Sequence, residues 1–231
     1  MARRVLLAWA MLPVVTLAGC VDAPRGPRRP ARSVSARMVS HPVVQPVPSS
    51  VATRACLVSL RQNAIGYVPV PDQYYGAGCS TLGSVRLAYL RSDSTQLGLA
   101  NAGPVTCQLA NALQGWARFG VDRAAQQILG SPLVKIETMG SYNCRNVAGT
   151  GRRSAHATAN AIDISGFLLA DGRRVTVLRD WRDEDPQIRA FLRAIHTSAC
   201  KRFNTVLSPD YNAAHRDHLH LEVGSGRPLC G

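Results

Sequence analysis

Two short segments concentrate the side chains suited to binding a metal ion. Residues 154–164 (SAHATANAIDI) and 215–220 (HRDHLH) hold four of the six histidines of this 231-residue chain, together with two aspartates. A lone histidine is usually a core or surface residue, but this density of histidine beside aspartate favours a metal site. Imidazole nitrogen and carboxylate oxygen suit Zn²⁺, and three protein ligands leave a fourth position open for water.

The second segment runs into a pattern typical of a β-strand. In a strand, His218, His220 and Glu222 project to one face, while Leu219 and Leu221 pack on the other. Taken alone, this pattern fits a half-buried strand with incidental histidines equally well. The first segment is the observation that favours the metal site.

The first segment has a spacing that requires a turn. His156 and Asp163 lie on opposite faces of any single strand, because they are an odd number of residues apart. We expect His156 in a loop that doubles back and Asp163 on the strand that this loop enters. The loop is what would bring the two side chains together.

The elements around these segments predict an α+β fold, with a small, mostly antiparallel sheet and flanking helices. Thr106 is the expected cap of a helix over 107–119, and a helix over 121–129 ends at Gly130. Asp185 caps a third helix, which runs to Cys200 and has Pro186 in its first position. Strands are expected within 63–72 and over 85–89, 133–139, 161–169, 175–178, 205–207 and 217–223.

The first 19 residues are a predicted signal peptide, in which two arginines precede an apolar run too short for a comfortable membrane span. Leu17-Ala18-Gly19-Cys20 resembles the bacterial lipoprotein signal, whose cysteine carries lipid; an ordinary secretory cleavage site is the alternative. Residues 20–52, rich in Pro and Arg, are expected to be a disordered basic tether to one domain at 53–231. The predicted location is the cell envelope, lipid-anchored and facing the periplasm, and Val21 favours the outer membrane by the same resemblance.

Six cysteines remain beside the one that is expected to carry lipid. An even number in an exported protein predicts disulfides, here three, although the sequence does not choose their pairing. A structural zinc–thiolate site is the weaker alternative, because no two of these cysteines have C-x-x-C spacing. The six are Cys56, Cys79, Cys107, Cys144, Cys200 and Cys230.

The formal charge of +13 comes mainly from arginine. A nucleic-acid binder can carry such a charge, but no basic–aromatic motif of a nucleic-acid-binding family occurs, and export argues against that role. We therefore expect no nucleic-acid partner. Anionic wall polymer and lipid head groups are the expected partners.

The two histidine segments also resemble known enzymes. Ser154-x-His156, Asp163 and Asp217-His218-x-His220 look like the signature of the zinc peptidases that include D-Ala-D-Ala carboxypeptidases, lysostaphin-type enzymes and the hedgehog fold. More closely, the runs GSYNCR (140–145), IDISGF (162–167) and SPDYN (208–212) resemble the bacterial extensin-like C-terminal domain family, over roughly Cys56 to Cys230. The resemblance implies a disulfide-stapled fold of this peptidase type and one Zn²⁺ ion, and we expect a monomer.

The resemblance implies a role for each matching position. It places the zinc ligands at His156, Asp163 and His220. Asp217 would be the general base for zinc-bound water, and His218 would stabilise the oxyanion or assist the leaving amine. Arg145 would face a substrate carboxylate or carbonyl, and Ser154 would shape the ligand loop or touch the substrate. The family of peptidases usually has glycine where Ala159 stands, so we expect a different local turn, since alanine adopts positive φ at a cost.

The predicted function is zinc-dependent cleavage of the peptide stems or cross-links of peptidoglycan in the bacterial envelope, as a carboxypeptidase or an endopeptidase. One alternative is an envelope lipoprotein of the same fold that binds metal or wall without catalysis, and another is an interaction protein with a purely structural zinc. The complete ligand set and Asp217 favour the enzyme. Glu222 and His215 are expected outside the ligand set. Arg152 and Arg153 are expected to be solvated, and contact with an acidic substrate is the alternative for them.

Overall fold

The computed structural model describes residues 50–231, so Cys20, the predicted signal peptide at 1–19 and most of the predicted tether at 20–52 lie outside the described residues. The described part combines helices with an extended sheet, and the predicted α+β class is confirmed. None of its helices has both the length and the apolar character needed to cross a membrane.

Ten strands form the main sheet of the described residues, in the order β1-β4-β5-β7-β8-β11-β10-β12, with β6 beside β4 and β9 beside β8. Neighbouring strands are antiparallel except for β5–β7 and β10–β12. The strands are β1 (Gly66–Pro69), β4 (Ser84–Arg91), β5 (Gln96–Ala100), β6 (Pro104–Thr106), β7 (Leu133–Gly140), β8 (Ala161–Leu169), β9 (Arg174–Thr176), β10 (Thr205–Leu207), β11 (Leu219–Glu222) and β12 (Leu229–Cys230). A separate small ribbon pairs β2 (Tyr74–Gly76) with β3 (Cys79–Ser80).

Three helix ends lie at the predicted residues Thr106, Gly130 and Asp185. Thr106 Oγ1 accepts a hydrogen bond from Leu109 N at 3.3 Å, Asp185 Oδ1 accepts one from Gln187 N at 2.7 Å, and Gly130 takes the left-handed conformation, with φ of 69°. The helices are α1 (Val51–Gln62), α2 (Cys107–Trp116), α3 (Arg123–Leu129), α4 (Val177–Asp180) and α5 (Pro186–Cys200). Helix α1 was not predicted, α2 ends at Trp116 rather than at 119, and α3 begins at Arg123 rather than at 121. Short helical turns are η1 (Ala117–Asp122), η2 (Ala155–Thr158) and η3 (Ala213–His215).

A π-helical turn, η1, joins α2 to α3 without a break. Gly120 in this turn lies so close to α5 that an added methyl group would come within 2.3 Å of Ser198 Oγ. At its end, the buried carboxylate of Asp122 accepts a hydrogen bond from Leu133 N at 2.9 Å. The wide turn therefore serves close helix packing and fixes the start of β7.

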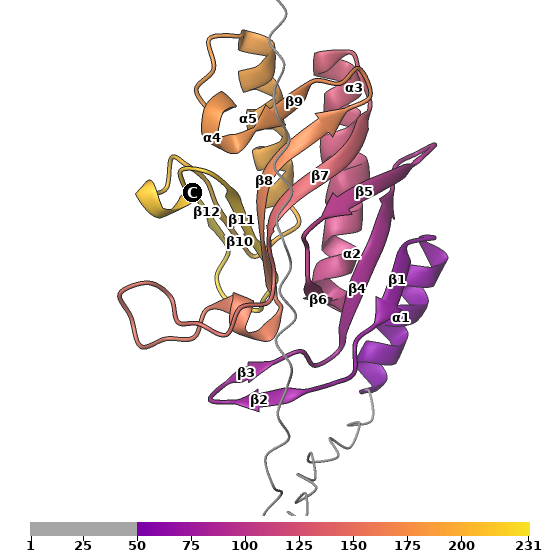
Figure 1. Ribbon diagram of the computed structural model, residues 1–231, viewed down its shortest axis with the longest axis vertical. Coiled ribbons are helices and arrows are strands. Elements are labelled where there is room, and N and C mark those ends of the chain that lie inside the picture. Colours follow the sequence, from indigo (N-terminus) through magenta and orange to yellow (C-terminus); the bar gives the residue numbers. More distant parts are fainter. Residues whose placement is uncertain (1–49) are drawn as a thin grey trace, which may run out of the picture. The chain divides into compact units, whose positions relative to one another are not determined.

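The core lies between the sheet and the helices α2, α3 and α5, which stand side by side behind the strands (Figure 1). Trp116 donates its indole N–H to Ile195 O of α5 at 2.9 Å. Phe167 of β8 packs edge-on against Trp116 and Phe191, with ring centroids 6.1 and 5.5 Å apart. The strand that carries Asp163 is thus anchored by large buried side chains.

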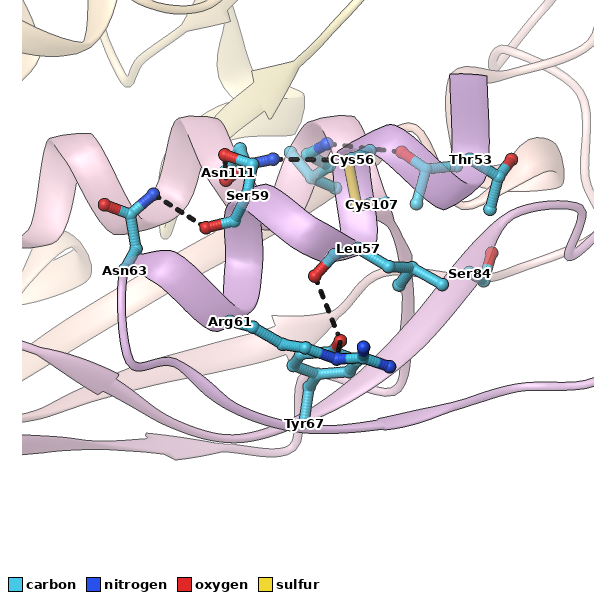
Figure 2. The surroundings of a disulfide bond; sticks show 12 residues. Thr53, Cys56, Leu57, Ser59, Arg61, Asn63, Tyr67, Ser84, Cys107 and Asn111 are labelled. Atoms are coloured by element: carbon cyan, nitrogen blue, oxygen red, sulfur yellow. Dashed lines mark hydrogen bonds between the residues drawn. A yellow bond between two sulfur atoms is a disulfide. The ribbon is translucent and has the colours of Figure 1, made fainter. Parts of the chain in front are cut away.

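Three disulfides staple the domain, as predicted. The pairs are Cys56–Cys107, Cys79–Cys144 and Cys200–Cys230. The first joins α1 to α2 (Figure 2), where Asn111 donates to Cys56 Sγ at 3.2 Å and accepts from Ser59 Oγ at 3.3 Å. All six cysteines are engaged, and the zinc–thiolate alternative is wrong.

The predicted strand over 175–178 is wrong in its second half. Strand β9 ends at Thr176, and Val177 begins the short helix α4. Asp180 explains the change, because its carboxylate accepts a hydrogen bond from Thr176 N at 2.5 Å and so satisfies a donor at the start of the helix. The predicted strand over 217–223 is also shorter, since β11 covers only Leu219–Glu222.

Candidate metal centre

The register of two antiparallel strands sets one pair of donor side chains face to face. In the β8–β11 pairing, His220 lies directly opposite Asp163. Directly opposed residues project to the same face of a sheet, and His220 Nδ1 lies 3.0 Å from Asp163 Oδ1. The neighbouring residues Ile162, Leu219 and Leu221 are fully buried on the other face. Core packing therefore fixes the register that makes the pair.

A third donor arrives from the turn before β8. His156 lies in η2, so the predicted loop that doubles back is present. Its Nε2 atom lies 3.2 Å from His220 Nδ1 and 3.3 Å from Asp163 Oδ2. The three side chains, which we call the donor cluster (His156, Asp163 and His220), have one donor atom each within 4.8 Å of the others.

Each histidine of the donor cluster is held through its second ring nitrogen. His156 Nδ1–H donates to Ser141 O at 2.5 Å, and Ser141 Oγ in turn donates to Ala161 O at 2.6 Å. His220 Nε2 lies 3.3 Å from Glu222 Oε2. Histidines that bind metals commonly have such a carbonyl or carboxylate partner, which fixes the tautomer and the ring orientation. The arrangement leaves His156 Nε2 and His220 Nδ1 as the atoms that face Asp163.

The donor set fits a Zn²⁺ ion. Two imidazole nitrogens and one carboxylate oxygen are ligands that zinc prefers, and three protein ligands leave a position open for a reactant. The cluster is largely enclosed, since His156 is 2 % and His220 is 8 % exposed. The predicted ligands His156, Asp163 and His220 are thus brought together.

Buried negative charge dominates the electrostatics of the cluster. Burial would raise the pKa of Asp163, but hydrogen bonds from His156 and His220 outweigh it and hold this pKa well below its usual value. Burial would lower the pKa of His220, but Asp163 and Glu222 raise it to about 9. The same carboxylates that favour a proton on His220 favour a metal cation in its place.

The predicted catalytic pair lies beside the cluster. His218 Nδ1 lies 2.8 Å from Asp217 Oδ1, and His218 Nε2 lies 3.5 Å from Asp163 Oδ1. Both residues precede β11, so the alternation of faces within that strand does not fix the direction of the Asp217 side chain. Within the described part of the chain, the one ion pair of Asp217 is with His218. The structure therefore places His218 between Asp217 and the donor cluster.

His220 of the donor cluster lines a cleft of about 710 Å³. Arg145 and Ser154, both predicted to meet the substrate, line this cleft together with His218, His220 and Glu222. Arg145 is exposed, and its positive charge contributes to lowering the pKa of His215. A group bound in the cleft would therefore contact both the cluster and a guanidinium group.

Residues 54–230 match a protein family described as Extensin-like protein C-terminus. The chain belongs to this family. No curated protein is similar enough to the chain to be counted as a match. The match spans the donor cluster, the Asp217–His218 pair and all six disulfide cysteines, so the extensin-like domain contains the whole site.

Ala159 keeps a left-handed turn at the end of η2 of the extensin-like domain, with φ of 55°. The expectation that alanine would change the turn is wrong. The residue is fully buried, and its carbonyl accepts a hydrogen bond from Thr106 N at 2.9 Å. Packing and this bond outweigh the strain, which is on the order of 1–2 kcal/mol for a residue with a Cβ atom.

His215 is part of the site in the extensin-like domain, although the sequence pattern left it outside. Its ring centroid lies 5.1 Å from that of His218 and 5.9 Å from that of His220, and Asn212 Oδ1 lies 2.8 Å from its Nδ1. Burial, followed by repulsion from His218 and His220, lowers its pKa to about 4. The H-x-x-H-x-H spacing of 215–220 was the available signal.

Proposed function

We propose that this extensin-like domain is a zinc-dependent peptidase that cleaves the peptide stems or cross-links of peptidoglycan. One observation carries the proposal: the donor cluster of His156, Asp163 and His220 lies beside an Asp–His pair, and its His220 lines a cleft that arginines also line. The resemblance of these positions to the zinc peptidases supports the same assignment. Amide hydrolysis needs a polarised carbonyl, an activated water and a proton donor for the leaving amine.

His156 Nε2, Asp163 and His220 Nδ1 would hold the ion, because these atoms converge. A bound Zn²⁺ ion supplies Lewis acidity and lowers the pKa of water to near 7. Ser141 O and Glu222 keep the two imidazole rings in the orientation that this binding requires. The chain therefore offers a prepared site rather than one that must be assembled around the ion.

Asp217 is the proposed general base. Its Oδ1 is engaged by His218, while its Oδ2 has no hydrogen bond among the described residues and is available to accept a proton. His218 lines the cleft, and its Nε2, 3.5 Å from Asp163 Oδ1, is the proposed proton donor to the leaving amine. Arg145 binds a carboxylate or carbonyl of the substrate, since a guanidinium group suits planar, bidentate contacts.

The proposed setting is the bacterial envelope. Cys20 would carry the lipid anchor, residues 20–52 would be the tether, and peptidoglycan would be the partner of a monomeric domain that faces the periplasm from the outer membrane. Replacing Cys20 by Ser should move the protein out of the membrane fraction and leave hydrolysis of soluble fragments intact. A Cys20→Ser protein that stays with salt-washed membranes would contradict the anchor.

The deciding experiment is digestion of purified muropeptides by residues 50–231 loaded with zinc, with mass analysis of the products. We expect loss of a terminal residue or scission of a cross-link, abolished by a chelator and restored by added zinc. The variant His156→Ala, digested in parallel, should be inactive. Stoichiometric zinc without any cleavage would reject the peptidase and favour the metal-binding alternative.

A further inference from the structure

One wall of the cleft comes from the segment that joins β11 to β12. Within this cleft wall, which we define as residues 224–229, Gly224, Ser225, Gly226, Arg227 and Leu229 line the cleft. Two glycines and a serine are small, so Arg227 is the one long side chain of the wall that carries a charge. The wall thus presents a single cation to the cleft.

A disulfide, a strand pairing and backbone hydrogen bonds fix the far end of the cleft wall, which runs into β12. The Cys200–Cys230 disulfide binds β12 to the end of α5, and β12 pairs in parallel with β10. Leu229 N donates to Asn204 O at 2.8 Å, and Gly231 N donates to Val206 O at 2.9 Å. The backbone that carries Arg227 is therefore held in place.

The near end of the wall is held as well. Asn204 N donates to Glu222 O at 2.8 Å, so one residue, Asn204, secures both β11 and β12. At the far end, Tyr211, which also lines the cleft, packs against Gly231, where an added methyl group would meet its ring at 2.6 Å. The segment is a loop with two anchored ends, and the position of Arg227 relative to His220 is set by them.

The guanidinium group of Arg227 has no hydrogen bond or ion pair within residues 50–231. Other arginines of this domain are engaged: Arg174 with Glu137 at 2.6 Å and Arg173 with Asp171 at 2.6 Å. Arg145 resembles Arg227, since its side chain also lacks a partner among the described residues. Arg152 also lines the cleft, and its guanidinium group has no partner within residues 50–231 either. Three unpaired cations thus line one cleft, and the acidic residue that lines it, Glu222, is already bonded to His220.

Arg145 and Arg227 come from different segments of the chain. Arg145 belongs to the segment between β7 and η2, which leads into β8, whereas Arg227 precedes β12. The strand order is β8-β11-β10-β12. At about 4.8 Å between neighbouring strands, β12 lies roughly 14 Å from β8. An extended peptide that lies along the cleft can therefore place one carboxylate on each of these two arginines.

We propose that Arg227 is a specificity-determining residue that binds a second carboxylate, so that the substrate is a peptide with two carboxylates, one on Arg227 and the other on Arg145. The inference rests on the proposed function for the identity of the site. It deepens that function by selecting acidic peptides over neutral ones. Glu222 would repel a carboxylate placed beside His220, and the arginines that line the cleft are where such groups are tolerated.

Binding of a synthetic stem pentapeptide, with lysine at its third position, tests the inference without turnover. Four forms are needed, with the glutamate carboxylate free or amidated and the terminal carboxylate free or amidated. Binding to residues 50–231 is followed by NMR titration in the presence of a chelator, for the wild type, Arg227→Gln, Arg145→Gln and the control Arg86→Gln. Arg86 is exposed on β4, outside the cleft, and its replacement removes the same charge.

We expect each amidation to weaken wild-type binding by about fivefold, as for an exposed charge pair. Arg227→Gln should abolish the effect of one amidation and Arg145→Gln the effect of the other, while Arg86→Gln changes neither. The inference is overturned if Arg227→Gln keeps both effects, or if both variants lose the same one. Because no cleavage is measured, a failure of the peptidase proposal is seen in muropeptide digestion and not here.

Discussion

Disulfides close two regions of the domain, and these regions differ in whether their polar side chains have partners. Around Cys56–Cys107, the polar side chains have hydrogen-bond partners within the region. Asn111 bonds to the side chain of Ser59, and Tyr67 bonds to the backbone carbonyl of Leu57 (Figure 2). Around Cys200–Cys230, the backbone is tied equally well, but Arg227 in the enclosed segment is left without a partner.

The difference shows where chemistry is expected in this fold. The first region satisfies its own hydrogen bonds and contributes stability. The ring closed by Cys200–Cys230 contains Asp217, His218 and His220, and it holds their backbone while the side chains of His218 and His220 line a cleft. Substitutions in the two regions should therefore separate stability from function.

Loss of a cluster donor is the largest expected effect. His220→Ala, like His156→Ala and Asp163→Ala, should lose bound zinc and lower turnover by about a thousandfold or more, because an open site depends on each ligand. Leu60→Ala, in α1 near Cys56, should instead cost about 2–5 kcal/mol of unfolding free energy and keep zinc. Metal analysis measures the bound zinc of each variant, and urea unfolding measures its free energy of unfolding. Full zinc occupancy in the three donor variants would reject the metal centre.

Asp217→Asn should keep zinc and lower kcat by about 10²–10⁴-fold, because an amide of the same shape does not accept a proton. Asp210→Asn is the matched control on the same segment, since Asp210 bonds to Trp181 and Arg193 rather than to the site. The control should turn over normally. Equal turnover in wild type and Asp217→Asn would assign the base to another group, with His218 the nearest candidate.

Removal of either Cys56–Cys107 or Cys200–Cys230 should lower the free energy of unfolding by about 3–4 kcal/mol, given the lengths of the closed loops. The double variant Cys200→Ser/Cys230→Ser should also raise KM for acidic peptides, because it frees the end of the cleft wall that carries Arg227. The double variant Cys56→Ser/Cys107→Ser should not change KM. Equal KM values in the two double variants, below their melting temperatures, would show that the cleft wall is held without its disulfide.

Glu222→Gln is expected to have the smallest effect. It should lower zinc affinity by about 10–100-fold while the fold stays intact, since a weaker acceptor then orients His220. Glu137→Gln makes the same change on β7, where the carboxylate pairs with Arg174, and should leave zinc affinity unaltered. Competition with a fluorescent chelator measures the zinc affinity of both variants. Unchanged affinity in Glu222→Gln would remove the orienting role of Glu222.

Local signals in the sequence predicted much of the fold around the cluster. Strand β8 begins and ends at the predicted residues, Ala161 and Leu169, because its alternation and the turn after it are local. The helix from Pro186 to Cys200 was predicted for the same reason, from Asp185 and one apolar stripe. These features depend on residues a few positions apart, which a single sequence reveals.

Features that depend on distant residues were not predictable. Nothing local indicates that His220 lies opposite Asp163, which lies 57 positions earlier in the chain, or which cysteines pair. Strand β5 was missed because Gly98 interrupts its pattern; the glycine allows close approach of Lys135 on β7. Strand β12 has only two residues and exists because β10 and a disulfide hold it.

The β8–β11 register has a consequence for the order of folding events. Asp163 and His220 are 57 residues apart, and His156 and His220 are 64 apart, so the cluster forms only after a long loop has closed. Pairings of such high contact order are slow, whereas His215, His218 and His220 are neighbours even in an unfolded chain. In a nascent chain, those three imidazoles are therefore the first group able to capture a stray transition metal. Late closure of the ladder then brings Asp163 and His156 to His220, the one imidazole that the two sets share.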